Sequence, residues 1–350
     1  MSRRFCPVFA ALLVMLFAPS AFGQSPSKDR LTDGVDRALV FLASQQAKDG
    51  AWPLGNQGNH PAVTSLAIMA YLSAGHVPGE GPYQANIEKG LRWVLDKQQP
   101  NGLFCIQNWE DMYQHGISTL MLCEVAAMSD AKTTREIKPK LEKAVKLILQ
   151  GQRAENSANR GGWRYRLDGN DADMSVSGWQ ILALRAARNL GCDVPAERIE
   201  LAMQFVQQCR DTRSGGFCYT PGSSVTNACT GTGVLALELC GKERHHSREA
   251  LLGGSYLLKN PLRYDEPHFF YSAYYSSQAM FQLGNNYWNI FRPQLHKLLL
   301  DSQQRNGSWL NNDPNGTSFS TALATLALTV EYRLLPIYQR DEESGSLKQN

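Results

Sequence analysis

The sequence predicts an all-α protein in which six helix pairs close into a ring, an (α/α)6 toroid. A short motif of Gln, Gly and an aromatic residue recurs along the chain, with aromatic anchors at Trp52, Phe104, Trp163, Phe217 and Trp309. Segments with helical apolar periodicity precede and follow each anchor. No stretch shows the strict apolar–polar alternation of a β-strand. These observations together favour a helical repeat protein.

The spacing of the anchors indicates six repeats. The first three intervals between anchors are 52, 59 and 54 residues, and the last interval of 92 residues is long enough for two repeats. We expect Tyr264 to be the anchor of a degenerate fifth copy. Neither end of the chain carries an obviously polar capping repeat, which favours a closed ring over an open superhelix.

The segment before each anchor is amphipathic, with Lys, Arg and Glu on one face, as expected of an outer layer of helices. The Gly of the motif is expected to end this helix in a left-handed conformation. The aromatic ring is expected to cover the end of the neighbouring pair and to be buried. The predicted outer helices span residues 34–46, 87–99, 141–152, 198–209 and 293–304.

The segment after each anchor is rich in Ala, Gly, Ser, Thr and Leu and has few charges. Helices that are apolar on nearly all sides are buried, so these segments predict an inner layer. The predicted inner helices span residues 63–74, 116–128, 174–190, 229–239, 271–283 and 321–334.

The ends of the chain differ from the repeats. Residues 1–23 resemble a signal peptide, because Arg3 and Arg4 precede a short apolar stretch and a small-residue cleavage site at 21–23. Residues 24–30 form a short linker, 31–337 the toroid and 338–350 a disordered polar tail. We therefore expect an exported protein, either periplasmic or secreted.

Removal of the signal takes away two Arg and no acidic residue, so the formal charge falls from +3 to +1. A nearly neutral chain gives no electrostatic reason to bind nucleic acid. Seven cysteines remain, and their spacing fits no zinc-knuckle pattern. We expect most to be buried small hydrophobic residues, with one or two disulfides. They are Cys105, Cys123, Cys192, Cys209, Cys218, Cys229 and Cys240.

The loops that lead from each outer helix to the next inner helix must all lie at one end of the ring. Their polar residues therefore surround one mouth, towards which the inner helices point their positive N-termini. Many such residues are also ordinary helix caps. The candidates in or next to these loops are His60, Trp109, Asp111, Tyr113, His115, Trp163, Arg164, Asp168, Asp171, Asp173, Asn227, Asp265, His268, Tyr271, Tyr274 and Asp313.

The repeats resemble the QW repeats of squalene and hopene cyclases over residues 31–337. The likeness is sharpest from Gly161 to Ser175, where Gly-Gly-Trp is followed by Asp-Ala-Asp-Met-Ser. This resembles the cyclase segment with Asp-x-Asp-Asp-Thr-Ala, which implies that Asp173 is the acid that protonates a polyene and Asp171 its neighbour. Met174 stands where that family has a further Asp, and those enzymes have two helical domains where this chain has one.

A single toroid also resembles the β-subunit of protein prenyltransferases, which holds zinc through Asp, Cys and His. The matching stretches are Asn227-Ala228-Cys229 and Phe270-Tyr271-Ser272. Only Cys229 of the three ligands is kept, and a zinc site needs three or four ligands. We therefore expect no metal and no cofactor.

The sequence leaves three functional hypotheses open. The first is an exported toroid that binds an apolar or isoprenoid-like molecule in a central cavity, with peripheral membrane contact left open. The ligand-binding candidates are His60, Trp109, Tyr113, His115, Trp163, Arg164, His268, Tyr271 and Tyr274. The second is a cyclase-type isomerase with Asp173 as proton donor. The third is a secreted polysaccharide lyase, or a scaffold for peptide or glycan.

Overall fold

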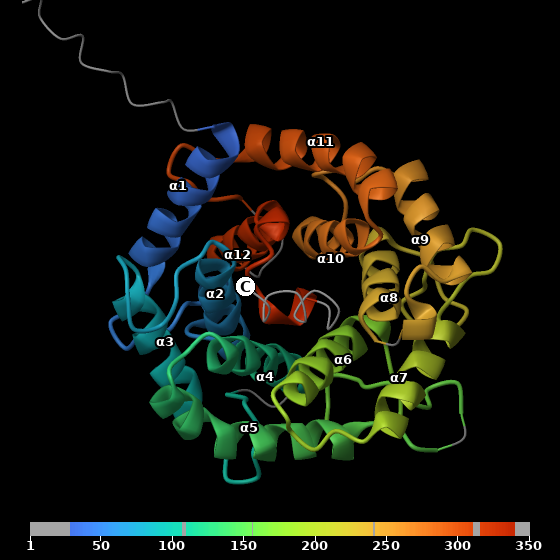
Figure 1. Cartoon of the computed structure of the whole chain (residues 1–350), viewed down its shortest axis with the longest axis horizontal. Coiled ribbons are helices and arrows are strands. Elements are labelled where there is room, and N and C mark those ends of the chain that lie inside the picture. The colour runs from blue at the N-terminus through green and yellow to red at the C-terminus, as the bar shows by residue number, and fades with distance from the viewer. Residues whose placement is uncertain (1–28, 107–109, 156, 241, 311–315, 340–350) are drawn as a thin grey trace, which may run out of the picture.

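The protein is a ring of helices in two concentric layers. The computed structural model describes residues 29–106, 110–155, 157–240, 242–310 and 316–339, and these residues contain twelve α-helices and no β-strand. Figure 1 shows one layer of helices enclosing the other. The predicted signal peptide, residues 24–28 of the linker and residues 340–350 of the tail lie outside the described residues.

The two layers alternate along the chain. The outer helices are α1 Arg30–Gln45, α3 Gln84–Asp96, α5 Ala131–Gly151, α7 Ala196–Gln208, α9 Arg248–Lys259 and α11 Asn285–Ser302. The inner helices are α2 Pro61–Ser73, α4 Asp111–Ala127, α6 Met174–Asn189, α8 Asn227–Leu239, α10 Phe269–Gln282 and α12 Gly316–Leu328. Nearly every inner-helix residue is buried, whereas the outer helices bury one face.

The ring closes between the last and the first repeat. Each inner helix contacts the next, from α2 through α4, α6, α8 and α10 to α12, and α12 contacts α2 again. In the outer layer α1 contacts α11, and α1 also contacts the inner helix α12. The predicted toroid is therefore confirmed.

At four of the junctions a repeated Gln joins an outer helix to the next one. The side-chain amide of Gln303 donates to the backbone oxygens of Gly307 in its own turn and of Gly34 in α1, at 3.0 and 2.8 Å. The three earlier copies make the same pair of bonds across the next junctions. We call these four residues the glutamine staples: Gln46, Gln98, Gln152 and Gln303.

The Gly of each motif is required by the same junction. Gly307 has a φ of +90°, and a Cβ built there would lie 2.1 Å from the backbone oxygen of Arg37 on the next outer helix. At Gly161 the corresponding distance to the oxygen of Leu201 is 1.9 Å. The positive φ of this Gly was expected, but the Gly was also expected to end the outer helix, and it does not. In the first repeat α1 ends at Gln45, and the equivalent Gly50 lies in the turn beyond the helix.

The fourth repeat departs from the pattern. The backbone of Arg210 forms an isolated β-bridge with Phe217, as that of Gln98 does with Phe104. Arg210 therefore occupies the position that the staple glutamine has in other repeats. It reaches α9 through an ion pair with Glu249 at 2.9 Å. Gln207 and Gln208, taken from the sequence as the motif residues, are exposed in the last turn of α7.

The tryptophan anchors are buried as expected. Trp52, Trp163 and Trp309 are 0% exposed, and each indole N–H donates at 2.7 Å to a carbonyl of the preceding outer helix. Tyr264, the expected fifth anchor, is only partly buried and packs against Phe269 and Phe270.

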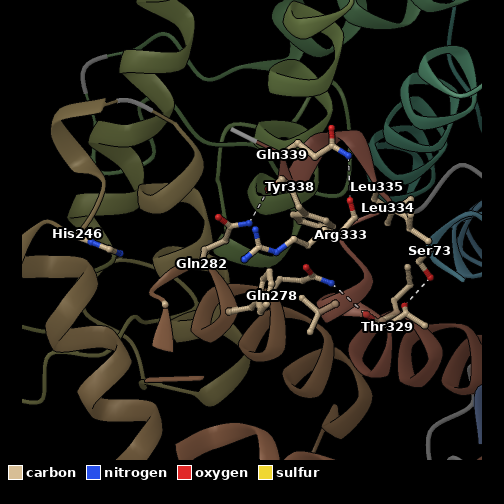
Figure 2. A pocket seen from close by; sticks show the side chains of 14 residues that line it. Ser73, His246, Gln278, Gln282, Thr329, Arg333, Leu334, Leu335, Tyr338 and Gln339 are labelled. Carbon is tan, nitrogen blue, oxygen red and sulfur yellow. Dashed lines mark hydrogen bonds between the residues drawn. The ribbon is translucent and has the colours of Figure 1, made fainter. Parts of the chain in front are cut away.

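The C-terminal residues fill the ring at the end opposite to the mouth. The last inner helix ends at Leu328 rather than 334, because the chain turns inward through Arg333, whose φ is +54°. The short helix η4, Pro336–Tyr338, then lies inside the inner ring against α4 and α6 (Figure 1). Tyr338 was expected in the tail, but its hydroxyl bonds that of Tyr274 and its carbonyl accepts from Gln282 at 2.9 Å (Figure 2).

Because the staple Gln303 joins the last repeat to the first, its substitution should destabilise the closed ring. Gln303→Ala removes two donated hydrogen bonds, so the free energy of unfolding should fall by about 1–3 kcal/mol. Gln207→Ala, at an exposed helix position, should change it by less than about 0.5 kcal/mol. Urea denaturation of both variants measures the difference, and equal midpoints would contradict the role of the staple.

The C-terminal segment predicts a pH dependence. Glu124 is 1% exposed and accepts the N–H of Ile337, and burial raises its pKa to about 8. Because the pKa of this carboxyl is higher in the folded than in the unfolded protein, its contribution to stability is complete below the pKa of the unfolded state. The contribution is lost as the pH rises from that value to the pKa of the folded state. Relative to Glu124→Gln, the wild-type protein should lose up to about 1.4 kcal/mol per pH unit between the two pKa values. Urea titrations from pH 5 to 9 test this, and parallel curves would refute it.

Candidate ligand-binding site at the mouth of the ring

A cavity of about 1000 Å³ opens at the end of the ring where the inner helices begin. Residues of all six repeats line it, from Leu54 in the first loop to Phe319 in α12. The expected convergence of the loops on one mouth is therefore found. We call this space the mouth cavity.

Aromatic side chains form part of the wall of the mouth cavity. Tyrosine hydroxyl groups are satisfied within the protein: Tyr165 and Tyr219 bond each other at 2.9 Å, and Tyr271 donates to the carbonyl of Ser175 at 2.9 Å. With their hydroxyls bonded, the rings supply apolar surface to the cavity. The aromatic residues of the wall are Tyr113, Tyr165, Tyr219, Tyr256, Tyr271 and Phe319.

Below this wall, aromatic side chains fill the centre of the ring. Trp179 of α6 is 0% exposed and stacks on Tyr274, with ring centroids 5.4 Å apart and planes at 12°. Tyr113, Tyr271 and Tyr275 contact the same indole. The cavity therefore lies at the mouth, and the centre of the ring, where the sequence analysis expected the ligand, is filled by side chains. The sequence analysis missed Trp179, although a Trp in a helix of small residues was a usable signal.

Two ionisable groups face each other on one side of the cavity. His60 is the residue before α2, its side chain is 3% exposed, and its Nε2 lies 3.6 Å from Oε1 of Glu110. Within the described residues neither ring nitrogen of His60 has a hydrogen-bond partner. His60 thus lines the cavity as predicted, and Glu110 was not among the sequence candidates.

The loop between α9 and α10 forms a charged rim. Arg263 pairs with Asp265 at 3.1 Å, and this contact lowers the pKa of the Asp265 carboxyl. Glu266 accepts from Asn227 at 3.2 Å, and burial raises its pKa. His268 ends the loop with a φ of +57° and also lines the cavity. The mouth cavity therefore combines an apolar wall with a polar rim.

Asp173 lies beside the cavity and is covered. It is the N-cap of α6, 0% exposed, and its Oδ1 accepts from the N–H of Val176 at 2.9 Å. Arg164 contacts its Oδ2 at 3.4 Å and holds the exposed Asp171 at 3.2 Å. The same guanidinium lies over the rings of Tyr165 and Tyr219, which do line the cavity. None of the residues Arg164, Asp171 and Asp173 therefore lines the mouth cavity.

Burial decides the ionisation of Asp173. Capping hydrogen bonds and Arg164 favour the carboxylate, but desolvation outweighs them and raises the pKa of Asp173. Asp130 caps α5 in the same way while exposed, and there the backbone bond to Thr133 lowers the pKa. A helix cap and a raised pKa are therefore compatible in this fold.

Three predicted ligand-binding residues belong to the core instead. His115 is 0% exposed, accepts the N–H of Phe104 at 3.1 Å and contacts the carbonyl of Ala144 at 3.0 Å. It replaces the Thr or Ser hydroxyl that accepts this N–H in other repeats. Trp163 and Tyr274 are likewise enclosed by the fold. Trp109 and Asp313 lie outside the described residues.

The residues at the prenyltransferase zinc position do line the cavity, but they make a poor donor set. Asn227 and Ser272 offer neutral oxygens, and burial raises the pKa of the Cys229 thiol to about 12. A zinc site needs three or four Cys, His or carboxylate ligands, and only Cys229 is of these types, so the three residues do not fit the ion. All seven cysteines of the described residues are buried, and the expected disulfides are not found among them.

The described helices include none that is both long and apolar enough to cross a membrane.

Comparison with known proteins supports the architecture. The family model described as the prenyltransferase alpha-alpha toroid domain matches residues 20–163, 113–263 and 165–335. Lanosterol synthase from Pneumocystis carinii is 30% identical in an alignment of 73 residues that covers 19% of this chain and 10% of that protein. The chain thus spans about a tenth of the length of this curated relative.

Several solved structures share the fold. The alpha-1,6-mannanase GH76A from Salegentibacter sp. HEL1_6 has a TM-score of 0.66 at 11% identity, covering 87% of this chain and 99% of that one. The type II terpene cyclase MstE from Scytonema has a TM-score of 0.57 at 14% identity, and the match covers 87% of this chain and 99% of that one. Protein geranylgeranyltransferase-I from Candida albicans has a TM-score of 0.54 at 12% identity, and the match covers 91% of this chain and 97% of that one. At such identities the likeness concerns the fold alone.

The two aspartate caps predict opposite titrations. The Asp173 carboxyl should titrate above the reference value of 3.8 and that of Asp130 below it, because burial dominates at the first cap alone. Asp173→Asn should keep the cap, whereas Asp173→Ala should lose about 0.5–2 kcal/mol of stability. Carboxyl NMR of the wild-type protein and both variants measures this. An Asp173 value below the reference would contradict the prediction.

Proposed function

Because the chain belongs to the prenyltransferase alpha-alpha toroid domain family, we propose that its mouth cavity binds an apolar, isoprenoid-like molecule. The observation that carries this proposal is a cavity of about 1000 Å³ whose lining includes six aromatic side chains together with several charged ones. Pockets for small molecules are commonly apolar with a few polar groups that fix orientation. An isoprenoid with a polar head matches this division.

The physical gain comes from the removal of the hydrocarbon chain from water. Each Å² of apolar surface that leaves water contributes about 25 cal/mol, so a long chain against the tyrosine wall gains several kcal/mol. Polar atoms of the head would face Glu110, Lys259, Arg263 and Glu266 at the rim. Neighbours in fold support the ligand class, since one was solved with geranylgeranyl dihydroxybenzoate and another with GGPP.

We propose that the protein binds its ligand and that Asp173 does not protonate it. The raised pKa of the Asp173 carboxyl would allow a protonated form at a higher pH than usual. However, its side chain is fully buried and contacts Arg164, and neither residue lines the mouth cavity. A general acid must lie within hydrogen-bond reach of the group it protonates. The isomerase hypothesis would therefore need Arg164 and the tyrosine wall to move.

Glycan binding is the second candidate, and adjacent carboxylates at the rim favour it. Asp265 and Glu266 both line the cavity beside tyrosine rings. A neighbour in fold, the mannanase, was solved with mannotriose as a variant in which two adjacent aspartates were changed. The lyase hypothesis has less support, since Arg164, Asp168, Asp171 and Asp173 all lie outside the cavity lining.

We also propose that the protein works after export, on the strength of the signal-like residues 1–23. In that setting its ligand would be a molecule of the periplasm or the external medium.

The binding proposal predicts the effect of a substitution that blocks the cavity. Ala228→Phe in the first turn of α8 places a ring in the mouth cavity, so binding of a geranylgeranyl-chain ligand should weaken at least tenfold. Ala196→Phe in the first turn of α7 is an exposed matched control that should bind normally. Isothermal titration of both variants, with mass spectrometry of molecules that co-purify with the wild type, measures this.

The outcomes separate the two candidates. Loss of the isoprenoid in Ala228→Phe alone supports the proposal. Binding of mannotriose instead, weakened by Ala228→Phe and by Glu266→Gln, would replace it with the glycan candidate. Equal isoprenoid binding by both phenylalanine variants would refute the mouth cavity as the site.

A further inference from the structure

A second group of ionisable side chains lies far from the mouth, at the C-terminal end of α8. Glu238 is the penultimate residue of α8, and His245 and His246 follow in the segment before α9. The potential ligand atoms of these three residues all lie within 4.8 Å of one another. Among the described residues this is the one such group of three His, Cys or carboxylate side chains.

The geometry is that of a compact donor set. Nδ1 of His245 lies 2.5 Å from Oε2 of Glu238, and Nε2 of His246 lies 3.7 Å from the same oxygen. Zinc bonds of 2.0–2.2 Å in a tetrahedral arrangement place ligand atoms roughly 3.3 Å apart. Shifts of about 1 Å or less would therefore bring the three atoms around one ion.

The types of donor also suit a metal. The rings of His245 and His246 lie with centroids 3.8 Å apart and planes at 35°. Two imidazoles and a carboxylate form a ligand set that suits Zn²⁺ and similar divalent ions.

The surrounding structure holds the donors in place. Glu238 has a side chain that is 0% exposed, and its second oxygen, Oε1, accepts the backbone N–H of His246 at 2.8 Å. His246 has a φ of +54°, an uncommon conformation for a residue other than Gly. Arg244, next to the histidines, pairs with Glu200 of α7 at 2.5 Å. Such secondary contacts orient ligands in metal sites.

We propose that Glu238, His245 and His246 bind a divalent transition-metal ion of the zinc class, through Oε2, Nδ1 and Nε2 respectively. Coordination through Nδ1 of His245 needs that nitrogen without its proton: in a neutral ring the proton moves to Nε2 of the same ring, and an imidazolium releases one proton to solvent. Three protein ligands leave a fourth position for water or a ligand atom.

One of the three donors also lines a second pocket. His246 lines a pocket of about 150 Å³ at the end of the ring opposite to the mouth. Figure 2 shows His246 at the edge of this pocket, apart from Gln282, Arg333 and Tyr338. The site therefore differs from the prenyltransferase zinc position around Cys229, and it does not depend on the proposed function of the mouth cavity.

The test is metal binding by the chelator-treated full chain. Titration with Zn²⁺ should show one equivalent bound with a Kd in the micromolar range or tighter, and Co²⁺ should give visible d–d bands. His246→Gln changes a side chain that is 46% exposed, so it should fold and weaken zinc binding at least tenfold. Binding should also weaken from pH 7.5 to pH 5, because protons compete for the ligands.

Controls make the result specific. His76→Gln changes a histidine that packs edge-on against Tyr83 outside the group, and Cys229→Ser changes the cysteine of the mouth. Both variants should bind zinc as the wild type does. Glu238→Gln keeps the size of the buried side chain and should bind more weakly. Zinc should raise the melting temperature of the wild type but not of His246→Gln.

Absence of zinc binding tighter than millimolar would overturn the proposal. It would also be overturned by His246→Gln and Glu238→Gln binding zinc with wild-type affinity, or by loss of the bound ion in Cys229→Ser.

Discussion

The structure depends on the contact between neighbouring outer helices, which a glutamine and a glycine make together at four of the junctions, the closing one included. The glutamine satisfies two carbonyl groups that belong to different helix pairs, and the glycine lets the turn approach the next helix closely. In the last copy Gln303 bonds Gly34, 269 residues away along the chain. Because the same contact recurs through the final junction, the helix pairs return to their starting point. A ring, rather than a superhelix, is the result.

Closure determines where a ligand site can lie. Inner helices that all run the same way bring six loops to one end, and those loops surround the mouth cavity. The opposite end is filled by residues 330–339, and the centre by the rings around Trp179. Within the described residues the mouth cavity, at about 1000 Å³, therefore offers more space for a ligand than the pocket of about 150 Å³ at the opposite end. The proposed metal donors at the end of α8 lie on that opposite face, where the inner helices finish.

The sequence predicted the parts of the fold that repeat. Helix pairs, buried tryptophans and positive-φ glycines followed from periodicity and from the special backbone of Gly. Parts that depend on one long-range contact were not predictable. Arg210 replaces a glutamine through its partner Glu249, and His115 replaces a hydroxyl through its bond to Phe104. A histidine next to a helix start gives the same local signal whether it faces a ligand or accepts a backbone N–H.

The same reasoning explains why family membership fixes the scaffold more firmly than the chemistry. The staples and glycines lie between outer helices, whereas Asn227, Cys229 and Ser272 lie at the mouth and take no part in these junctions. Zinc ligands can therefore be replaced at the mouth without disturbing ring closure. An acid such as Asp173 can likewise stay as a buried helix cap after its access to the cavity is covered by Arg164. Function in this fold must consequently be argued from the side chains that line the cavity, because the repeat motif constrains only the wall that holds them.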